Sequence, residues 1–345
     1  MNYWLKLLLV SAPIYIAILV AQRLRYRSKV GENGYGFSST AEQVAEGFDM
    51  KGLVAVVTGA TNGLGFETSK VFVARGAHVI VTGRSLSKAT KAKTAIEKIM
   101  KEKGVKNIDS QITPMELDIS DLSSIEEFVE NFASLEIPLH ILMNNAGIMA
   151  LPERNLTMNG FEMQMGVNHL GHFHLTNLLT PFLKQSAPSK IISVSSVAHR
   201  SANLAFLNSP NLETAYNPIT AYGNSKLANI LHAAELDSRL SKDGVRAYSL
   251  HPGVIDTGLG KHLPEGFVKV MSIFRPILER ILLRTVEQGA STQVYAALHT
   301  TEFEGGKYFQ DCQVKETAYE EVVNDETARK KFWEISENLI ANAKR

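Results

Sequence analysis

From about residue 53 onward, short runs of apolar and β-branched residues alternate with longer stretches of mixed polarity. A run of about four to eight such residues predicts a strand that is buried on both faces of a sheet. The runs lie at Leu53–Thr58, His78–Thr82, Ile112–Leu117, His140–Met143, Lys190–Ser195 and Val245–Leu250, with a short one near Lys307–Phe309.

The stretches between these runs have the polarity pattern of helices. They cover Gly63–Arg75, Ser87–Lys103, Leu122–Phe132, Phe161–Leu183 and Ala221–Leu240. Strands that alternate with helices form a parallel sheet covered on both faces, and right-handed crossovers make such a sheet doubly wound. The expected fold class is therefore α/β, with a Rossmann-type, doubly wound parallel sheet of about seven strands.

The N-terminal residues follow a different pattern. Tyr3–Ala21 is apolar apart from three positions and, at about 1.5 Å per residue, is long enough to form one transmembrane helix. Four basic residues follow within 23–29, which predicts that the downstream chain faces the cytosol, at the endoplasmic reticulum or another organelle membrane. A cleaved signal or targeting segment is one alternative, and a buried helix is another.

Three parts are therefore expected: a membrane anchor with its basic flank over 1–29, a connector over 30–49, and one domain over 50–345. Thr40 and Gln43 have the spacing of a capping box, which predicts a short helix in the connector. No repeat and no stretch with the composition of a flexible linker divides the rest.

Composition narrows the class of protein. Hydrophobic residues make up 45% of the chain, enough for a large core, and the net charge of +1 gives no overall field that would attract nucleic acid. Cys312 is the single cysteine, so an intramolecular disulfide is impossible, which fits a reducing compartment.

Three glycines, Gly59, Gly63 and Gly65, lie between the first strand and its helix. Glycine lets the backbone approach phosphate oxygens, and a helix N-terminus supplies N–H donors, so this turn predicts a dinucleotide site. Its spacing departs from the common G-x-G-x-x-G pattern. After the second strand, Arg84 and Ser85 offer a guanidinium and a hydroxyl where a carboxylate would select NAD, so NADP(H) is the expected cofactor.

Tyr222 and Lys226 are four residues apart and share one face of a predicted helix. A phenol beside an ammonium can move a proton while a cofactor moves a hydride, although such a pair also occurs on ordinary helix surfaces. His169, His172 and His174 have helical spacing but no Cys, Asp or Glu partners, so packing is expected and no metal.

Six motifs occur together in this chain: Thr58-Gly-x3-Gly-x-Gly65, Asn144-Asn-Ala-Gly147, Asn168 in Val-Asn-His-Leu-Gly, Ser196 in Val-Ser-Ser-Val-Ala, Tyr222-x3-Lys226, and Pro252-Gly253. By their type and order, the sequence resembles the short-chain dehydrogenase/reductase family over about residues 50–310. The N-terminal anchor, Asn145-Ala-Gly-Ile-Met149 and Asn168-His-Leu-Gly-His-Phe173 are similar to its retinol dehydrogenase-like group.

The resemblance implies roles for individual residues. Tyr222 is the general acid/base, with its pKa lowered by Lys226 and the oxidised nicotinamide; Lys226 also holds the nicotinamide ribose. Ser196 binds the substrate oxygen, and Asn168 anchors a water that links Lys226 to solvent. Ser195 is adjacent to Ser196, and strand alternation sends only one of them into the cleft. The remaining implied cofactor contacts are Gly59, Thr61, Asn62, Gly63, Leu64, Gly65, Arg84, Ser85, Asp118, Asn145, Ala146, Gly147, Pro252, Gly253 and Thr257.

The expected activity is an NAD(P)-dependent interconversion of a hydrophobic alcohol, retinoid-, sterol- or polyprenol-like, and its aldehyde or ketone. The insert Ala198–Thr220 is expected to form one wall of the substrate site. Residues 258–285 are expected to form its lid, either as a helix packed on the core or as a helix lying on a membrane surface. A ring-reducing enzyme and a redox-sensitive NADP-binding scaffold with little turnover are the alternatives. A homodimer through Phe161–Leu183 and Ala221–Leu240 is a further expectation from the resemblance.

Overall fold

A computed structural model describes residues 21–22, 24–105, 111–211, 216–255, 283–301 and 304–343. Its centre is an eight-stranded sheet in the order β3-β2-β1-β4-β5-β6-β7-β8, in which every neighbouring pair is parallel except β7 and β8. The strands are β1 (Val54–Val57), β2 (His78–Gly83), β3 (Ile112–Glu116), β4 (Ile141–Asn144), β5 (Ser189–Val194), β6 (Val245–His251), β7 (Tyr308–Gln310) and β8 (Gln313–Val314).

The expected α/β fold with a parallel sheet is confirmed, and the strand β8 is an addition to it. Asp311 and Cys312 connect β7 to β8, and both have positive φ angles, 56° and 59°. Two consecutive left-handed residues form a tight hairpin turn, which is usually encoded by Asn-Gly or Asp-Gly. The dipeptide Asp-Cys carries no such signal, so the hairpin could not be recognised from the sequence.

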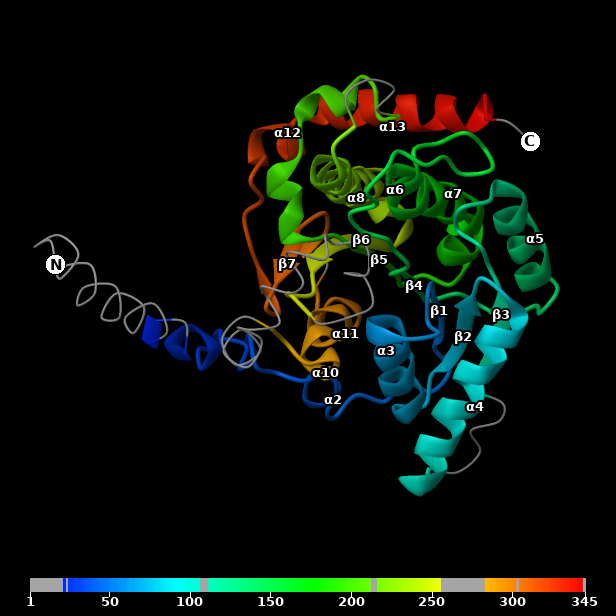
Figure 1. Cartoon of the computed structure of the whole chain (residues 1–345). Helices are drawn as coiled ribbons and strands as arrows, with labels where there is room; N and C mark the ends of the chain where they lie inside the picture. The colour runs from blue at the N-terminus through cyan, green and yellow to red at the C-terminus, as the bar shows by residue number, and fades with distance from the viewer. Residues whose placement is uncertain are drawn as a thin grey trace, which may run out of the picture.

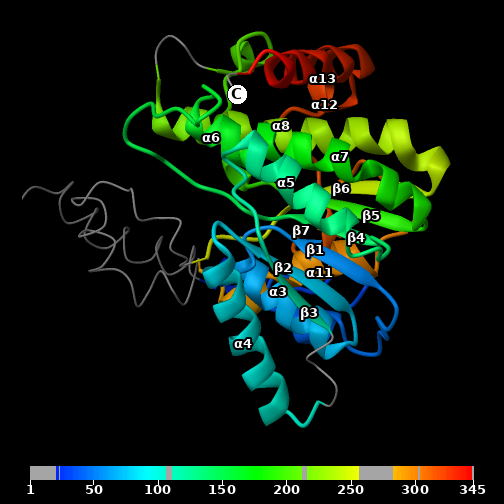
Figure 2. The same ribbon diagram turned by 90° about the vertical axis from the view of Figure 1, so that its right-hand side faces the viewer.

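Helices cover both faces of the sheet (Figures 1 and 2). On one face lie α5 (Leu122–Ala133), α7 (Gly171–Gln185) and α8 (Pro218–Leu240), and on the other α3 (Gly63–Ala74), α4 (Leu86–Glu102) and α11 (Ser291–Leu298). Shorter helices are α2 (Ala41–Val44), α6 (Met163–Met165), α10 (Val286–Gly289) and α12 (Glu320–Asn324), and the chain ends with α13 (Glu326–Ala341).

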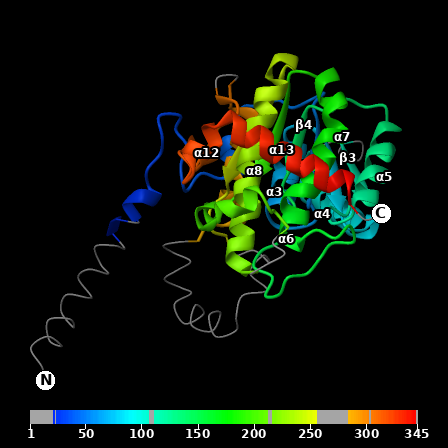
Figure 3. The same cartoon turned by 90° about the horizontal axis from the view of Figure 1, so that it is seen from above.

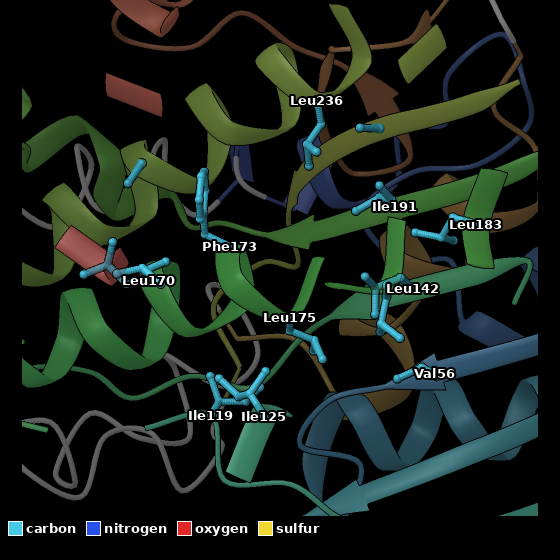
Figure 4. Close-up of a cluster of buried hydrophobic side chains, with 14 of the residues drawn as sticks. Val56, Ile119, Ile125, Leu142, Leu170, Phe173, Leu175, Leu183, Ile191 and Leu236 are labelled. Carbon is cyan, nitrogen blue, oxygen red and sulfur yellow. The ribbon is translucent and has the colours of Figure 1, made fainter. Parts of the chain in front are cut away.

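Each face of the sheet has its own hydrophobic core. Val56, Leu142 and Ile191 point from neighbouring strands toward the α7 and α8 side, where they pack with Phe173 and Leu236 (Figure 4). The opposite core joins the other strand positions to α3, α4 and α11. The alternate residues of each strand therefore fill both cores, as a parallel sheet covered on two faces requires.

The helix expected over Phe161–Leu183 is not continuous. After α6, residues Gly166–Leu170 form a π-helical turn, and a regular helix resumes as α7 at Gly171. A Cβ atom at Gly171 would collide with the carbonyl oxygen of Ile119. Hydrophobic spacing cannot distinguish a π turn from an α turn, and π turns concentrate at functional sites.

The connector packs against the domain. The expected capping box of Thr40 and Gln43 is present and begins α2. Ala41 and Val44 are buried in the same core as β1, and His299 Nε2 lies 2.7 Å from the Val44 carbonyl oxygen. The residues before β1 are thus fixed to the sheet by apolar packing and a hydrogen bond.

Two expected elements fall on residues that the structure does not describe. The predicted anchor Tyr3–Ala21 lies outside them except for Ala21, and so does most of the predicted lid over 258–285, together with Thr257. Among the described residues, none of the helices has the length and apolar character that crossing a membrane requires.

The C-terminal helix α13 crosses α7 and α8 (Figure 3). Trp333 packs edge-on against Phe173, with ring centroids 4.6 Å apart, and the Arg239 guanidinium lies 4.1 Å from the Trp333 ring centre. This helix therefore contacts part of the two helices through which a homodimer was expected, and the homodimer itself stays a prediction.

Candidate functional site

The residues singled out in the sequence meet at the carboxyl ends of β1, β4, β5 and β6. β1 and β4 are neighbours in the sheet although two strands separate them in the chain, so the direction of winding reverses between them. Open α/β sheets bind their ligands at such a switch point.

The glycine turn lies directly at this switch point. Gly59 has a φ of 65°, and a Cβ atom there would be 3.0 Å from Cα of Ala146, so only glycine lets the two turns approach this closely. Among the described residues, the Asn62 side chain makes no capping hydrogen bond to α3, although Asn62 occupies the N-cap position. The N–H groups of Gly63, Leu64 and Gly65 can therefore serve an anion, which fits the pyrophosphate of a dinucleotide.

Thr58 connects the glycine turn after β1 to the turn after β4, and it was not among the expected site residues. Its Oγ1 accepts hydrogen bonds from the backbone N–H groups of Asn145, at 2.8 Å, and Ala146, at 2.9 Å. His172 Nε2 lies 2.9 Å from the same oxygen. Thr58 begins the glycine motif, so the motif itself could have indicated it.

Asn145 is fixed on both sides of its amide group. Its Nδ2 donates to the Thr58 carbonyl oxygen at 2.8 Å, and its Oδ1 accepts from Gln293 Nε2 at 2.8 Å. Gln293 is fully buried on α11, and no sequence signal pointed to it. The turn after β4 is therefore held in place by α11, which lies on the same face of the sheet as α3.

The expected adenosine end of the site lies at the ends of β2 and β3. Arg84 is exposed directly after β2, and Ser85 caps α4. Asp118 follows β3, where its carboxylate accepts two hydrogen bonds from Ser120. A second carboxylate, that of Glu116 at the end of β3, also lies here, although no motif in the sequence indicated it. Its Oε2 accepts a hydrogen bond from the Leu86 N–H at 3.1 Å.

Tyr222, Lys226 and Ser196 are brought together. Tyr222 and Lys226 are 7% and 4% exposed, and the ammonium nitrogen lies 5.6 Å from the centre of the phenol ring. Tyr222 is hydrogen-bonded to the side chain of Ser196. Lys226 Nζ also donates to the Val194 carbonyl oxygen at 3.0 Å, which fixes the ammonium at the end of β5.

Burial changes the proton affinity of both groups. It raises the pKa of Tyr222 to about 12, and the hydrogen bond with Ser196 opposes that rise. It lowers the pKa of Lys226 to about 7. The sequence-based expectation of a lowered Tyr222 pKa included the charge of the oxidised nicotinamide and stays a prediction; burial of the phenol acts in the opposite direction.

The two adjacent serines have different surroundings. Ser195 is 2% exposed, and its hydroxyl donates to the Lys226 carbonyl oxygen at 2.7 Å. Ser196 begins the 3₁₀ turn η2 (Val197–Ser201) and contacts Tyr222. Ser195 thus holds the helix α8, and Ser196 is the serine that faces the phenol.

Asn168 lies in the π turn and joins three segments. Its amide group pairs with both the N–H and the carbonyl oxygen of Ile148, each at 2.9 Å, and donates to Ser225 Oγ at 2.9 Å. A Cβ atom at Gly147 would lie 3.2 Å from Asn168 Oδ1 and 3.5 Å from Lys226 Nζ. The π turn therefore places Asn168 beside Lys226, with glycine leaving the space between them open.

The turn after β6 is held by a residue absent from the sequence-based set. Gly253 has a φ of 95°, and the Arg284 guanidinium lies against it and donates to the Pro252 carbonyl oxygen at 3.3 Å. Arg284 is 3% exposed and forms an ion pair with Asp311. Arg284 lies within the predicted lid over 258–285, and nothing in the sequence indicated this contact.

The three histidines of the π turn and α7 have packing partners. His172 contacts Thr58, His169 Nε2 lies 3.3 Å from Ser336 Oγ, and His174 Nε2 lies 3.2 Å from Glu126 Oε1. No group of His, Cys, Asp or Glu side chains suited to a metal ion occurs within the described parts of the chain.

Comparison with known proteins gives consistent matches. The family model for short chain dehydrogenases matches residues 53–266. A chloroplastic short-chain dehydrogenase of Brassica napus, TIC 32 B, is 38% identical over 328 residues, covering 90% of this chain and 96% of the relative. Human retinol dehydrogenase 11 is 40% identical over 292 residues, covering 84% of this chain and 86% of the relative. A crystal structure of a protein from Mycobacterium paratuberculosis has a TM-score of 0.66 and 30% identity, covering 89% of this chain and 98% of that one.

Proposed function

The chain belongs to the short chain dehydrogenase family, and from this membership we propose that it is a membrane-anchored, NADP-dependent oxidoreductase of hydrophobic alcohols and their aldehydes or ketones. Family membership makes it an oxidoreductase with a nicotinamide dinucleotide cofactor. The observation that carries the proposal is the contact of Tyr222 with Ser196 beside Lys226.

In the proposed mechanism, the cofactor supplies or accepts a hydride, and the chain manages the proton. Ser196 donates a hydrogen bond to the carbonyl oxygen of the substrate, and Tyr222 delivers its phenolic proton to the same oxygen as the alcohol forms. A phenol with a raised pKa is fully protonated at neutral pH, so Tyr222 is ready to act as an acid in the reducing direction.

Lys226 has two tasks in this proposal. Its amine interacts with the phenol and, by the family resemblance, holds the nicotinamide ribose. Because its pKa lies at about 7, it exchanges a proton readily near neutral pH. The Asn168 side chain and the Lys226 ammonium both lie next to Gly147. In this proposal, Asn168 supports transfer of that proton to solvent through a bound water.

NADP is the proposed cofactor because Arg84, exposed after β2, can pair with a 2′-phosphate. The donors of the uncapped α3 N-terminus would hold the pyrophosphate. Asn145, Ala146 and Gly147 would line the nicotinamide side together with Pro252 and Gly253.

A hydrophobic substrate is proposed from the relatives' names, which include retinol dehydrogenases, and from the apolar residues of the proposed lid over 258–285. The proposed anchor over 3–21 would keep the domain at a membrane, where such substrates dissolve. The proposal places the domain on the cytosolic side.

The test is NADPH oxidation by the purified full chain with a panel of retinoid, sterol and polyprenol carbonyl compounds. We expect turnover with at least one of them, and a KM for NADPH at least about tenfold below that for NADH. Arg84→Ala should remove this preference by raising the KM for NADPH alone. Tight NADPH binding without turnover on any compound would favour the scaffold function, and equal use of both cofactors would refute the NADP assignment.

A further inference from the structure

His199 is a buried histidine next to the active site that the proposed mechanism does not use. It lies in the turn η2, three residues after Ser196, and is 1% exposed. His199 is the second residue of the insert Ala198–Thr220, which is expected to form one wall of the substrate site.

Both ring nitrogens of His199 have backbone partners. Nδ1 lies 2.7 Å from the Ser196 carbonyl oxygen, and Nε2 lies 3.1 Å from the Ala318 backbone nitrogen. A carbonyl oxygen only accepts a hydrogen bond, and an amide N–H only donates one. The ring is therefore neutral and carries its proton on Nδ1, because a proton on Nε2 would face the N–H of Ala318.

The segment that contains Ala318 is bound to the same turn by a second residue. Tyr319 OH donates to the Ala202 carbonyl oxygen at 2.7 Å. The His199 ring also packs edge-on against Tyr308, with centroids 5.2 Å apart. His199 and Tyr319 thus tie the turn that begins at Ser196 to the chain between β8 and α12.

We propose that neutral His199 is a positioning residue, which orients Ser196 toward Tyr222 by holding the Ser196 carbonyl group and the turn that follows it. This inference rests on the proposed function, in which Ser196 binds the substrate oxygen. Ser196 is the N-cap residue of η2, and its Oγ accepts from the Ala198 N–H at 3.1 Å, so the direction of its side chain depends on the geometry of this turn. A displaced turn would separate Ser196 from the phenol.

The charged groups around His199 favour its neutral form. Burial is the main cause of the lowered His199 pKa, and the charge of Arg200 lowers it further, while Glu320 and the bond to Ser196 oppose the shift. His251, itself buried, also interacts with it. Protonation below the usual pKa range of histidine would break the bond from Ala318, so turnover should fall in acid.

Two substitutions separate the two hydrogen bonds. His199→Asn keeps a donor near the position of Nδ1, and His199→Gln keeps an acceptor near the position of Nε2. We expect the Asn variant to retain kcat within about threefold and to lose the fall of turnover at acid pH. The Gln variant should lose about tenfold or more in kcat, with little change in the KM for NADPH. Equal losses of kcat in both variants, in proportion to their losses of Tm, would overturn the proposal.

The tautomer is measurable without turnover. In ¹⁵N-histidine NMR spectra of the full chain in detergent, His199, assigned by its absence in the Asn variant, should show a protonated Nδ1 and an unprotonated Nε2 at pH 7. A protonated Nε2 at that pH would refute the positioning role, whatever the activity. A wild-type protein that reduces no carbonyl compound would instead refute the proposed function and leave the tautomer result to stand by itself.

Discussion

Removal from water dominates the chemistry of the two residues at the centre of the site. Tyr222 and Lys226 are both almost fully buried, and burial moves their pKa values apart, raising that of Tyr222 to about 12 and lowering that of Lys226 to about 7. Each group then favours its uncharged form. Holding the Lys226 ammonium at this buried position therefore costs free energy in the folded state.

Replacing Lys226 with methionine should therefore stabilise the protein while it abolishes turnover. The Lys226 pKa in the folded state lies below its unfolded value of about 10.4, so the unfolded chain binds more protons between these two values. Stability of the wild type should consequently rise with pH in this window. We expect Lys226→Met to raise the free energy of unfolding by about 1–3 kcal/mol at pH 7, with a gain that shrinks toward pH 10.

Urea denaturation of both proteins at pH 7 and pH 10 measures this difference. Lys190→Met is a useful control, because burial also lowers the Lys190 pKa, to about 8, at a site far from the proposed chemistry. A Lys226 variant that is less stable than the wild type at pH 7 would contradict this explanation of the site.

Single residues also show where sequence reasoning reached its limit. Tyr222, Ser196 and Lys226 could be identified because their spacing and motifs carry chemistry. Gln293 and Arg284 could not, because each acts through a contact with a segment more than twenty residues away. Such contacts depend on how the helices pack, which no local pattern encodes.

Among the helices and turns, the π turn before α7 was the hardest to predict from the sequence, and it positions Asn168 in the candidate site. Apolar spacing predicted a continuous helix, and the structure inserts Gly166–Leu170 as a wider turn. That turn brings Asn168 to Ile148, in the loop after β4, and to Ser225 on α8. The strands, in contrast, were predicted well, because short runs of apolar and β-branched residues favour buried strands over helices.

Gly171→Ala tests how closely this region is packed. Alanine in place of a helical glycine usually stabilises a helix by about 1 kcal/mol. Here the new methyl group would meet the Ile119 carbonyl oxygen, which is backbone and cannot move aside cheaply. We expect a loss of at least about 2 kcal/mol in the free energy of unfolding, with lower turnover because Asn168 shifts. A more stable variant in thermal denaturation would show that the helix and the loop at Ile119 are not in contact.

At the scale of the whole molecule, residues 26–37, which follow the proposed anchor, are part of the folded unit. Tyr26 OH is hydrogen-bonded to Asp311, and the guanidinium of Arg284 lies 4.2 Å from the centre of the Phe37 ring. Arg284 also donates a hydrogen bond to the Pro252 carbonyl oxygen. The residues that follow the proposed anchor are therefore linked through Arg284 to the Pro252–Gly253 turn of the candidate cofactor site.

Two truncations should therefore behave differently. Deletion of residues 1–20 is expected to release the protein from membranes without loss of stability, whereas deletion of 1–29 also removes Tyr26 and Arg27. The longer deletion should lower the free energy of unfolding by about 1–2 kcal/mol through loss of the Asp311 hydrogen bond and the contact of Arg27 with Phe37. Alkaline carbonate extraction of the full chain completes the test, because release into the supernatant would refute a spanning anchor.

The C-terminal helix gives the molecule a further constraint. Because α13 packs across α7 and α8, a homodimer through these two helices would have to accommodate α13 (Figure 3). The resemblance to the short-chain dehydrogenase family, including its retinol dehydrogenase-like group, is confirmed by the comparisons.

The central claim is that Tyr222 transfers the proton while it contacts Ser196. The most direct measurement is the kcat for NADPH-dependent reduction of a lipid aldehyde by the wild type, Tyr222→Phe and, as a matched control, Tyr216→Phe, whose hydroxyl bonds to the Leu151 carbonyl oxygen and Gln164 instead. Tyr222→Phe should lower kcat by at least about a thousandfold with an unchanged far-ultraviolet spectrum and unchanged NADPH affinity, and Tyr216→Phe should retain activity within about threefold. A Tyr222→Phe variant that turns over at the wild-type rate would contradict the proposed chemistry at its centre.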